Sequence, residues 1–160
     1  MRPSPDVLTA LFENAPNFVE RLLTADVASY RELIDRAEQL ATELPEDEQI
    51  ELIDGHPRIG ADARSVSTQS YREQGYHQGA GEGDEDLAGR LDHLNAEYER
   101  HFGFRFCIFV DGRPRSEVAD VMEGRIGAAR EDELRRGLSD VFAIARSRLG
   151  KLTQPLEEAR

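Results

Sequence analysis

The sequence predicts an all-α fold: a single-domain bundle of about 7–9 helices with one extended, Phe-rich segment at about residues 104–110. Most of the chain repeats apolar residues at the three- and four-residue spacing of a helix, and helix start and stop signals separate these stretches. Residues 104–110 are instead rich in aromatic and β-branched side chains, which favour extended backbone. A length of 160 residues suits one domain spanning residues 1–160.

The first two predicted helices are short and begin with proline signals. Ser4-Pro5-Asp6 supplies a cap, a proline at the first helical position and an early negative charge. The apolar stripe that follows is interrupted at Asn14-Ala15-Pro16. A second helix then carries its apolar face on Phe18, Val19, Leu22 and Leu23.

Two further helices lead to a histidine. Ser29-Tyr30-Arg31-Glu32 is a capping box that opens the third helix. Leu44-Pro45 ends that helix and starts the fourth, which we expect Gly55 to end in a left-handed conformation. His56 therefore emerges at a helix C-terminus, where the helix dipole favours the imidazolium form, and Pro57 stiffens the turn that carries it.

The second half contains four predicted helices and the extended segment. The helices run from near Ser67 through Gln74 to about His77, from about Asp84 to His101-Phe102-Gly103, from Ser116 to about Ile126, and from about Arg130 to Leu152. The stretch 79–84 is a flexible loop by composition, Asp111–Pro114 is a turn, and the tail 153–160 is expected to be frayed. One extended segment cannot form a sheet, so its backbone must pair with side chains or water.

Composition excludes several classes of protein. The net charge of −12 would repel nucleic acids and anionic membranes, and no apolar run approaches the roughly 18 residues of a membrane span. The N-terminus has no apolar signal core, and the single cysteine, Cys107, rules out an internal disulfide. These features predict a cytoplasmic protein without nucleic-acid or membrane partners.

Two short motifs indicate chemistry. The first is His56-Pro57, and the second is Ser70-Tyr71-Arg72-Glu73-Gln74. In a helix, the hydroxyl, carboxylate and amide of the second motif stand at i, i+3 and i+4 and share one face. Together the motifs offer a proton-transfer group, a carboxylate able to tune it and neutral hydrogen-bonding groups. Such a set could perform acid–base chemistry on a small polar molecule without a metal or an organic cofactor.

Plainer interpretations exist for each of these residues. His56 could be a structural residue that bonds spare carbonyls at a helix end, and Ser70-x-x-Glu73 could be only a capping box. Arg148 could be a surface arginine of the last helix. The other histidines, His77, His93 and His101, form no convincing metal set, Cys107 reads as a small buried hydrophobe, and the glycine run 79–83 lacks the flanking signals of a phosphate loop.

A set of ordered motifs resembles a known family. The motifs are His56-Pro57-Arg58-Ile59-Gly60, Ser70-x-x-Glu73-Gln74, Leu94-Asn95-x-x-Tyr98, Phe102-Gly103-Phe104-x-Phe106, Glu133-Leu134-Arg135 and Ile144-Ala145-x-x-Arg148-Leu149. In order and spacing they resemble the 2-oxo-4-hydroxy-4-carboxy-5-ureidoimidazoline (OHCU) decarboxylases of purine catabolism, from about Leu8 to Leu152. The resemblance implies an all-helical, often dimeric fold that uses no cofactor and converts OHCU, formed from urate, into (S)-allantoin.

The resemblance also implies roles for individual residues. His56 matches the catalytic histidine of the family and Glu73 matches its carboxylate. Substrate-contacting positions correspond to Pro57, Ser70, Gln74, the stretch Phe106 to Val110 with Phe106, Ile108 and Val110, and Arg148 on the last helix. Two positions depart from the family pattern: Asn17 replaces a bulkier apolar or aromatic residue, and Asp111 replaces a basic one.

Two other functions remain open at this point. The chain could be a non-catalytic helical binding module for a ureide or another small amide, with the same pocket. It could also be a purely structural helical interaction domain, which would need no closed polar cleft around His56 and Glu73.

Overall fold

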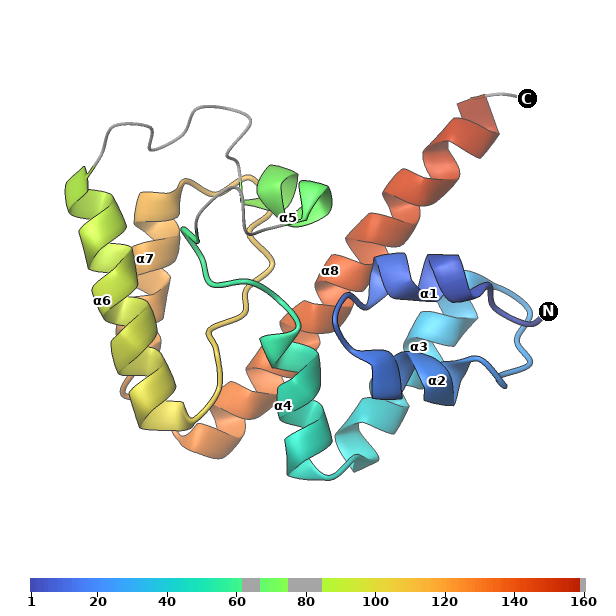
Figure 1. Cartoon of the computed structure of the whole chain (residues 1–160), viewed down its shortest axis with the longest axis horizontal. Helices are drawn as coiled ribbons and strands as arrows, with labels where there is room; N and C mark the ends of the chain where they lie inside the picture. The colour runs from blue at the N-terminus through green and yellow to red at the C-terminus, as the bar shows by residue number, and fades with distance from the viewer. Residues whose placement is uncertain (62–66, 75–84, 159–160) are drawn as a thin grey trace. The chain divides into compact units, whose positions relative to one another are not determined.

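The computed structural model describes residues 1–61, 67–74 and 85–158, with side chains up to residue 152. Within these ranges the chain forms eight α-helices and no strand, which confirms the predicted all-α class (Figure 1). The helices are α1 (Pro5–Leu11), α2 (Pro16–Leu22), α3 (Tyr30–Glu43), α4 (Glu46–Asp54), α5 (Thr68–Glu73), α6 (Glu85–Phe102), α7 (Arg115–Arg125) and α8 (Arg130–Glu158).

The chain divides into two compact units. Unit 1 combines Met1–Gly55 with Leu138–Arg160, and unit 2 is His56–Gly137. Helix α8 therefore contributes its first residues to unit 2 and the rest to unit 1. That the whole chain behaves as one domain stays a prediction. Helix α8 reaches Glu158, so the structure extends it beyond the predicted end at Leu152 into the tail that we expected to be frayed.

Unit 1 is built around an aromatic cluster. Helix α1 packs against α2, and α2 against α4 (Figure 1). Phe12, Phe18 and Phe142 meet edge to face, with ring centroids 5.2–6.2 Å apart, an arrangement that aromatic rings favour. On the surface, Arg146 of α8 donates to Asp35 of α3 at 2.9 Å. The first and last parts of the sequence thus share one core.

Several helix starts follow the sequence signals. Pro5 opens α1 after Ser4, as predicted. Ser29 caps α3, because its hydroxyl accepts from the Glu32 backbone N–H at 3.1 Å. The return bond of the capping box is shifted by one residue: the Glu32 carboxylate accepts from the N–H of Ala28 at 2.7 Å. Asn17, one of the two departures from the family pattern, donates to Glu51 of α4 at 3.0 Å.

The predicted left-handed conformation of Gly55 is wrong. Gly55 has right-handed helical angles, with φ −64° and ψ −19°. A glycine fits here because space is short: a Cβ atom at this position would lie 2.5 Å from the carbonyl oxygen of Glu13. The neighbouring Asn14 adopts φ 55° and donates its side-chain amide to the Gly55 carbonyl at 3.1 Å. Close backbone approach, and not helix termination, therefore explains the glycine.

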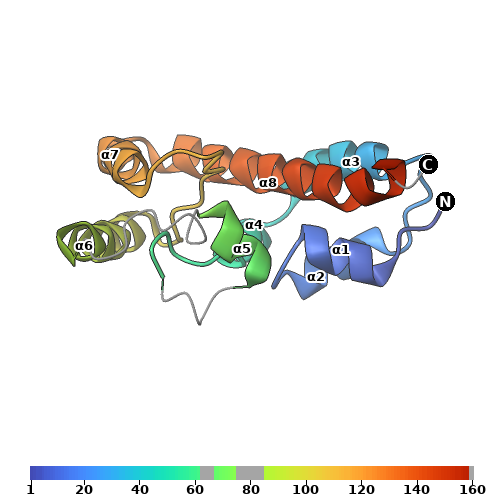
Figure 2. The same ribbon diagram turned by 90° about the horizontal axis from the view of Figure 1, so that it is seen from above.

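Unit 2 places helices α6 and α7 side by side (Figures 1 and 2). Its Phe-rich segment packs among aromatic side chains. The rings of Phe102, Phe104 and Phe106 lie 4.5–6.0 Å from that of Tyr98. Residues 105–110 belong to no helix or strand, and Phe104 lies in a bend, so the segment forms no sheet, as predicted.

Arginine side chains bind the backbone of this extended segment. This agrees with the expectation that its backbone pairs with side chains or water. Arg136 donates to the Cys107 carbonyl at 2.8 Å, and just before the segment the Nε atom of Arg130 donates to the carbonyl of Phe102, the last residue of α6, at 2.9 Å. Arg113 donates its Nε to the Val110 carbonyl at 3.0 Å. These charged donors satisfy carbonyl groups that a neighbouring strand would bind in a sheet.

The segment ends in a tight turn at the predicted place. Asp111 and Gly112 have φ values of 50° and 74°, and the N–H of Arg113 donates to the Val110 carbonyl at 3.1 Å. Positive φ at both central residues is the signature of a type I′ turn, which favours Asp followed by Gly. The second departure from the family pattern, Asp111, is therefore a residue suited to this turn.

Candidate active site

His56 stands directly after helix α4, at the start of a turn that spans residues 56–60. Its side chain is buried, with 7% of the residue exposed, while Pro57 is half-buried. A buried imidazole at this place agrees with the predicted position of His56 past a helix end. The turn itself has no regular secondary structure, so its shape must be fixed from outside.

Three side chains from separate elements hold the backbone of this turn. Gln74, at the end of α5, accepts from the N–H of Gly60 at 2.9 Å and donates to the carbonyl of Arg58 at 3.2 Å. Asn95 of α6 donates to the carbonyl of Ile59 at 3.0 Å, and Arg105 of the extended segment donates to the carbonyl of His56 at 3.3 Å. Both polar atoms of the Gln74 amide are thus engaged with the turn.

Gly60 closes the turn in a conformation that other residues avoid. Its φ is 79°, and a Cβ atom there would lie 3.0 Å from the Cδ1 atom of Leu91 on α6. The positive φ directs the Gly60 N–H to the Gln74 amide. The glycine of the His56–Gly60 motif therefore serves the geometry of the turn.

The predicted second motif lies on helix α5 and at its end. Ser67 is the N-cap, and its hydroxyl accepts from the Ser70 N–H at 3.1 Å. The interpretation of Ser70-x-x-Glu73 as a capping box is therefore wrong, because Ser70 lies inside the helix. Ser70 is 3% exposed and Glu73 is half-buried. The direct pairing of Glu73 with His56 stays a prediction. Residues 75–77 and the predicted loop 79–84 lie outside the described residues.

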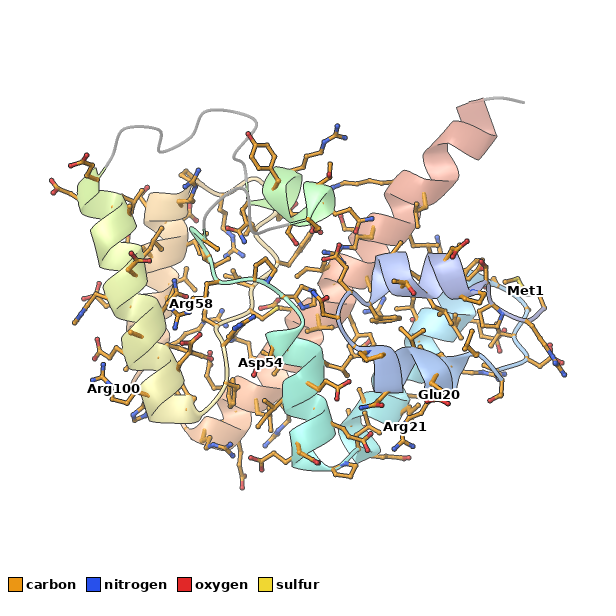
Figure 3. The ribbon with its side chains drawn as sticks, in the orientation of Figure 1. Met1, Glu20, Arg21, Asp54, Arg58 and Arg100 are labelled. Atoms are coloured by element: carbon orange, nitrogen blue, oxygen red, sulfur yellow. The ribbon has the colours of Figure 1, made fainter. Side chains whose placement is uncertain are left out.

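A carboxylate on α6 connects two arginines around the turn. Glu99 accepts two hydrogen bonds from the guanidinium group of Arg58, one of them from Nε at 3.0 Å. Figure 3 shows Arg58 beside α6. The Nε atom of Arg105 lies 3.9 Å from the same carboxylate. The Glu99 hydrogen bonds raise the pKa of Arg58, which keeps this exposed guanidinium fully charged.

A second, deeper network supports the extended segment. The Tyr98 hydroxyl donates to the buried Glu133 carboxylate at 2.8 Å, and the Nε atom of Arg136 donates to the same oxygen at 2.8 Å. Arg136 also lies over the Phe106 ring, 5.0 Å from its centroid, besides bonding the Cys107 carbonyl. Burial raises the pKa of the Tyr98 hydroxyl, and the hydrogen bond to Glu133 raises it further.

The residues of the Phe-rich segment that were predicted to contact a substrate have buried side chains. Phe106, Ile108 and Val110 are 1%, 4% and 6% exposed. Their side chains are therefore buried, and two carbonyl groups of the stretch, those of Cys107 and Val110, already accept hydrogen bonds from Arg136 and Arg113. Cys107 is 2% exposed, which confirms its interpretation as a small buried hydrophobe.

Arg148 belongs to the part of α8 in unit 1. It is 2% exposed, so its interpretation as a surface arginine is wrong. Its guanidinium donates to the carbonyl of Ala10 at 3.2 Å and lies 3.6 Å from the carboxylate of Glu13. The predicted site residues therefore come from both units: Arg148 from unit 1, and His56 with the α5 motif and the extended segment from unit 2.

Other candidate features in the described part of the chain do not extend this site. No group of three or more His, Cys, Asp or Glu side chains there could hold a metal ion, and His93 and His101 are exposed. None of the described helices is long and apolar enough to cross a membrane. A cavity of about 320 Å³ in unit 2 contains none of the predicted site residues; its lining is Arg90, His93, Leu94, Glu97, Glu123, Ile126 and Gly127.

The sequence reasoning missed the residues that support the turn. Asn95 belongs to the Leu94–Tyr98 motif, and its four-residue spacing from Glu99 places both side chains on one face of α6, which is a signal that they could act together. Arg105 stands between Phe104 and Phe106. A charged residue between two aromatic residues indicates that its side chain binds a polar partner. Glu133 and Arg136 carried no signal of their partners, because Tyr98 and Cys107 are distant in sequence.

Comparisons with known proteins agree on one family. The sequence profile of the family described as OHCU decarboxylase matches residues 4–150. The chain is 28% identical over 148 residues to the uric acid degradation bifunctional protein PucL of Bacillus subtilis (strain 168), covering 92% of this chain and 30% of that protein. It is 33% identical over 112 residues to the 2-oxo-4-hydroxy-4-carboxy-5-ureidoimidazoline decarboxylase of Mus musculus, covering 68% of this chain and 62% of that one.

Solved structures show the same fold. A structure described as OHCU decarboxylase in the presence of (S)-allantoin aligns with a TM-score of 0.73 at 19% identity, covering 94% of this chain and 98% of that one. A structure described as (S)-allantoin synthase aligns with a TM-score of 0.67 at 20% identity, covering 92% of this chain and 48% of that one. The chain spans less than a third of the length of the two Bacillus relatives, 30% and 29%.

Proposed function

This chain belongs to the OHCU decarboxylase family, and we propose that the protein decarboxylates OHCU to (S)-allantoin in the breakdown of urate. The name of the mouse relative describes this decarboxylase, and the names of the Bacillus relatives describe uric acid degradation. The single observation that carries the proposal is the buried imidazole of His56 on a turn held by Gln74, Asn95 and Arg105. A fixed proton-transfer group is what this reaction needs.

The substrate has its leaving group beside an electron sink. In OHCU the carboxylate and a hydroxyl share one ring carbon, C4, and the ureido-bearing neighbour, C5, is part of a ring C=N bond. When the C4–carboxylate bond breaks, its electron pair forms a C4=C5 double bond and the ring nitrogen takes a proton. C5 then receives a proton while the C4 hydroxyl loses one and becomes a carbonyl. Overall, one carboxylate anion and one proton give CO2 and allantoin.

His56 is the proposed catalyst of the proton steps. Its imidazole would take the C4 hydroxyl proton and deliver a proton to one face of C5, which sets the handedness of the product. Glu73 would orient the ring and favour its charged form if it accepts a hydrogen bond from it. General acid–base help of this kind contributes about 10²- to 10⁴-fold, and orientation of the bound substrate must supply the rest.

The other predicted residues would hold the substrate. We propose that Ser70, Gln74 and backbone groups of residues 106–110 bind the ureido and ring amide groups, beside Pro57. Arg148 would bind the leaving carboxylate, because a guanidinium forms two parallel hydrogen bonds with such a group. The burial of Ser70, Phe106, Ile108 and Val110 supports a preformed surface for these contacts. None of these steps calls on a cofactor.

The assembly and location of the protein are also proposals. We expect a homodimer in the cytoplasm, as the family resemblance and the single buried cysteine favour. Light scattering coupled to size-exclusion chromatography of the whole protein tests the dimer, with a monomer mass as the contrary result.

The test of the function uses freshly generated OHCU. We expect the protein to speed the loss of OHCU ultraviolet absorbance and to give (S)-allantoin, measured by circular dichroism. His56→Asn should lower turnover by about 10²-fold or more, while His93→Asn, which alters an exposed histidine, should not. Near-normal turnover in His56→Asn, or racemic allantoin formed at the enzymatic rate, would overturn the role of His56.

The same assay separates the alternative function. If the protein binds allantoin in a calorimeter but leaves the spontaneous decay of OHCU unchanged, it is a binding module for a ureide or small amide. If it neither binds allantoin nor speeds the decay, the interpretation as a structural interaction domain gains support.

A further inference from the structure

We infer that Glu99 is a positioning residue for His56 and acts through Arg58 and Arg105; the inference rests on the proposed function. The side chain of Glu99 lies between two arginines that attach to the turn on either side of Pro57. Arg58 is itself part of the turn and gives Glu99 two hydrogen bonds. Arg105 lies 3.9 Å from the Glu99 carboxylate and donates its other end to the His56 carbonyl at 3.3 Å.

The charges explain why a carboxylate is needed at position 99. The guanidinium groups of Arg58 and Arg105 are like charges that both lie at the Glu99 carboxylate, and they would repel each other without this anion between them. The Glu99 side chain is 23% exposed, so solvent screens this pair of contacts only in part. The two carboxylate oxygens can also accept both hydrogen bonds of the Arg58 guanidinium, whereas a neutral amide has only one oxygen to accept them.

The orientation of Arg105 depends on this anion. Arg105 leaves the extended segment as a long, partly exposed side chain with many rotamers, and 43% of it is exposed. The attraction of Glu99 restricts those rotamers to ones that place a donor at the His56 carbonyl. Glu99 therefore fixes the peptide that carries the imidazole without any need to contact substrate.

Because catalytic geometry tolerates little displacement, a shift of about 1 Å in this peptide can cost on the order of 10² in rate. We expect Glu99→Gln to lower kcat about tenfold, with KM within about twofold of wild type. The matched control is Glu97→Gln, which removes a carboxylate of the same helix that faces His93 at 3.6 Å. This control should keep both constants near wild type.

A double-mutant cycle tests the route through Arg105. If Glu99 acts through this arginine, Arg105→Met alone should lower kcat, and adding Glu99→Gln to it should cost less than Glu99→Gln costs in the wild-type background. Strict additivity of the two effects on kcat would overturn the route.

A measurement without turnover separates this inference from the proposed function. The ¹H–¹⁵N signals of the His56 imidazole, assigned by their loss in His56→Asn, should move in Glu99→Gln and stay in place in Glu97→Gln. Moved signals in a protein that does not decarboxylate OHCU would support the positioning and overturn the proposed function. Unmoved signals would overturn the positioning even if kcat falls, as would a fall in kcat that tracks only the unfolded fraction.

If Glu99→Gln does not fold, Glu99→Asp serves in its place. This variant keeps the charge but withdraws it by one methylene, so it can pair with Arg58 or Arg105 but not span both. An intermediate loss of kcat with a smaller shift of the imidazole signals supports the inference, and wild-type values of both contradict it.

Discussion

The backbone of Gly55 lies against the carbonyl oxygen of Glu13, so closely that a Cβ atom at position 55 would stand 2.5 Å from it. Asn14 completes the junction by donating its side-chain amide to the Gly55 carbonyl. The end of α4 is thus docked onto the connection between α1 and α2, one residue before His56. The start of the turn that carries His56 is therefore anchored by closely packed backbone, which can move only at a cost in free energy.

We therefore expect Gly55→Ala to lower the free energy of unfolding by about 1–3 kcal/mol, because the added methyl group must push two backbone segments apart. Gly89→Ala on α6 is the matched control, since its Cβ atom would meet nothing within 4 Å. That control should raise the free energy of unfolding by about 0.5–1 kcal/mol through helix propensity. Urea denaturation measures both, and equal effects in the two variants would contradict the steric explanation.

A second prediction concerns the amide of Gln74. In Gln74→Glu an ionised oxygen would replace the nitrogen that donates to the Arg58 carbonyl, and the two oxygens would repel. The folded-state pKa of the new carboxyl should lie above the ordinary value of about 4.3. The folded protein then binds more protons than the unfolded chain above that pH, so the free energy of unfolding falls as the pH rises toward neutrality.

Urea denaturation of Gln74→Glu from pH 4 to 7 measures this loss, and Gln74→Met is the control, because it lacks a titrating group. Gln74→Met should show a pH-independent cost relative to wild type. A Gln74→Glu variant as stable at pH 7 as at pH 4, relative to wild type, would show that the amide does not hold the turn.

The third prediction uses the buried Tyr98. Its pKa is raised in the folded state, so above pH 10 the unfolded chain loses the hydroxyl proton while the folded protein keeps it. The unfolded state then binds fewer protons, and Tyr98 makes the free energy of unfolding fall by about 1.4 kcal/mol per pH unit above about pH 10.

Tyr98→Phe removes this dependence. At pH 7 we expect it to be less stable than wild type by about 1.5–3 kcal/mol, because the Glu133 carboxylate loses a donor. The difference should shrink as the pH rises above 10. Denaturant titrations of both proteins at several alkaline pH values measure it, and a constant difference would be the contrary result.

Most of the fold followed from local signals. The starts of α1 and α3, the break at Asn14–Pro16 and the turn at Asp111–Gly112 each rest on residues next to one another in sequence. The prediction for Gly55 was wrong for the opposite reason. The Glu13 carbonyl, which is far away in sequence, leaves no room for a Cβ atom at position 55. The residues on either side of Gly55 in the sequence give no indication of this contact.

The sequence supplied candidate chemical groups for the site, but it did not predict the side chains that hold the turn. His56 and Ser70 are buried, and their roles in the site stay predictions. The bonds from Asn95 and Arg105 to the turn join parts of the chain that only the folded structure brings together. Arg148 shows the same limit, since helical spacing could not tell that it would be buried beside Glu13.

Unit 1 is closed by residues from the two extremes of the sequence, with Phe142 of α8 seated against Phe12 and Phe18. During synthesis, α1 and α2 leave the ribosome long before Phe142 is added to the chain. Unit 2, which ends at Gly137, is fully translated before Phe142. Until Phe142 is available, the rings of Phe12 and Phe18 lack this packing partner. At that stage, binding to chaperones or self-association of the nascent chain would compete with native packing.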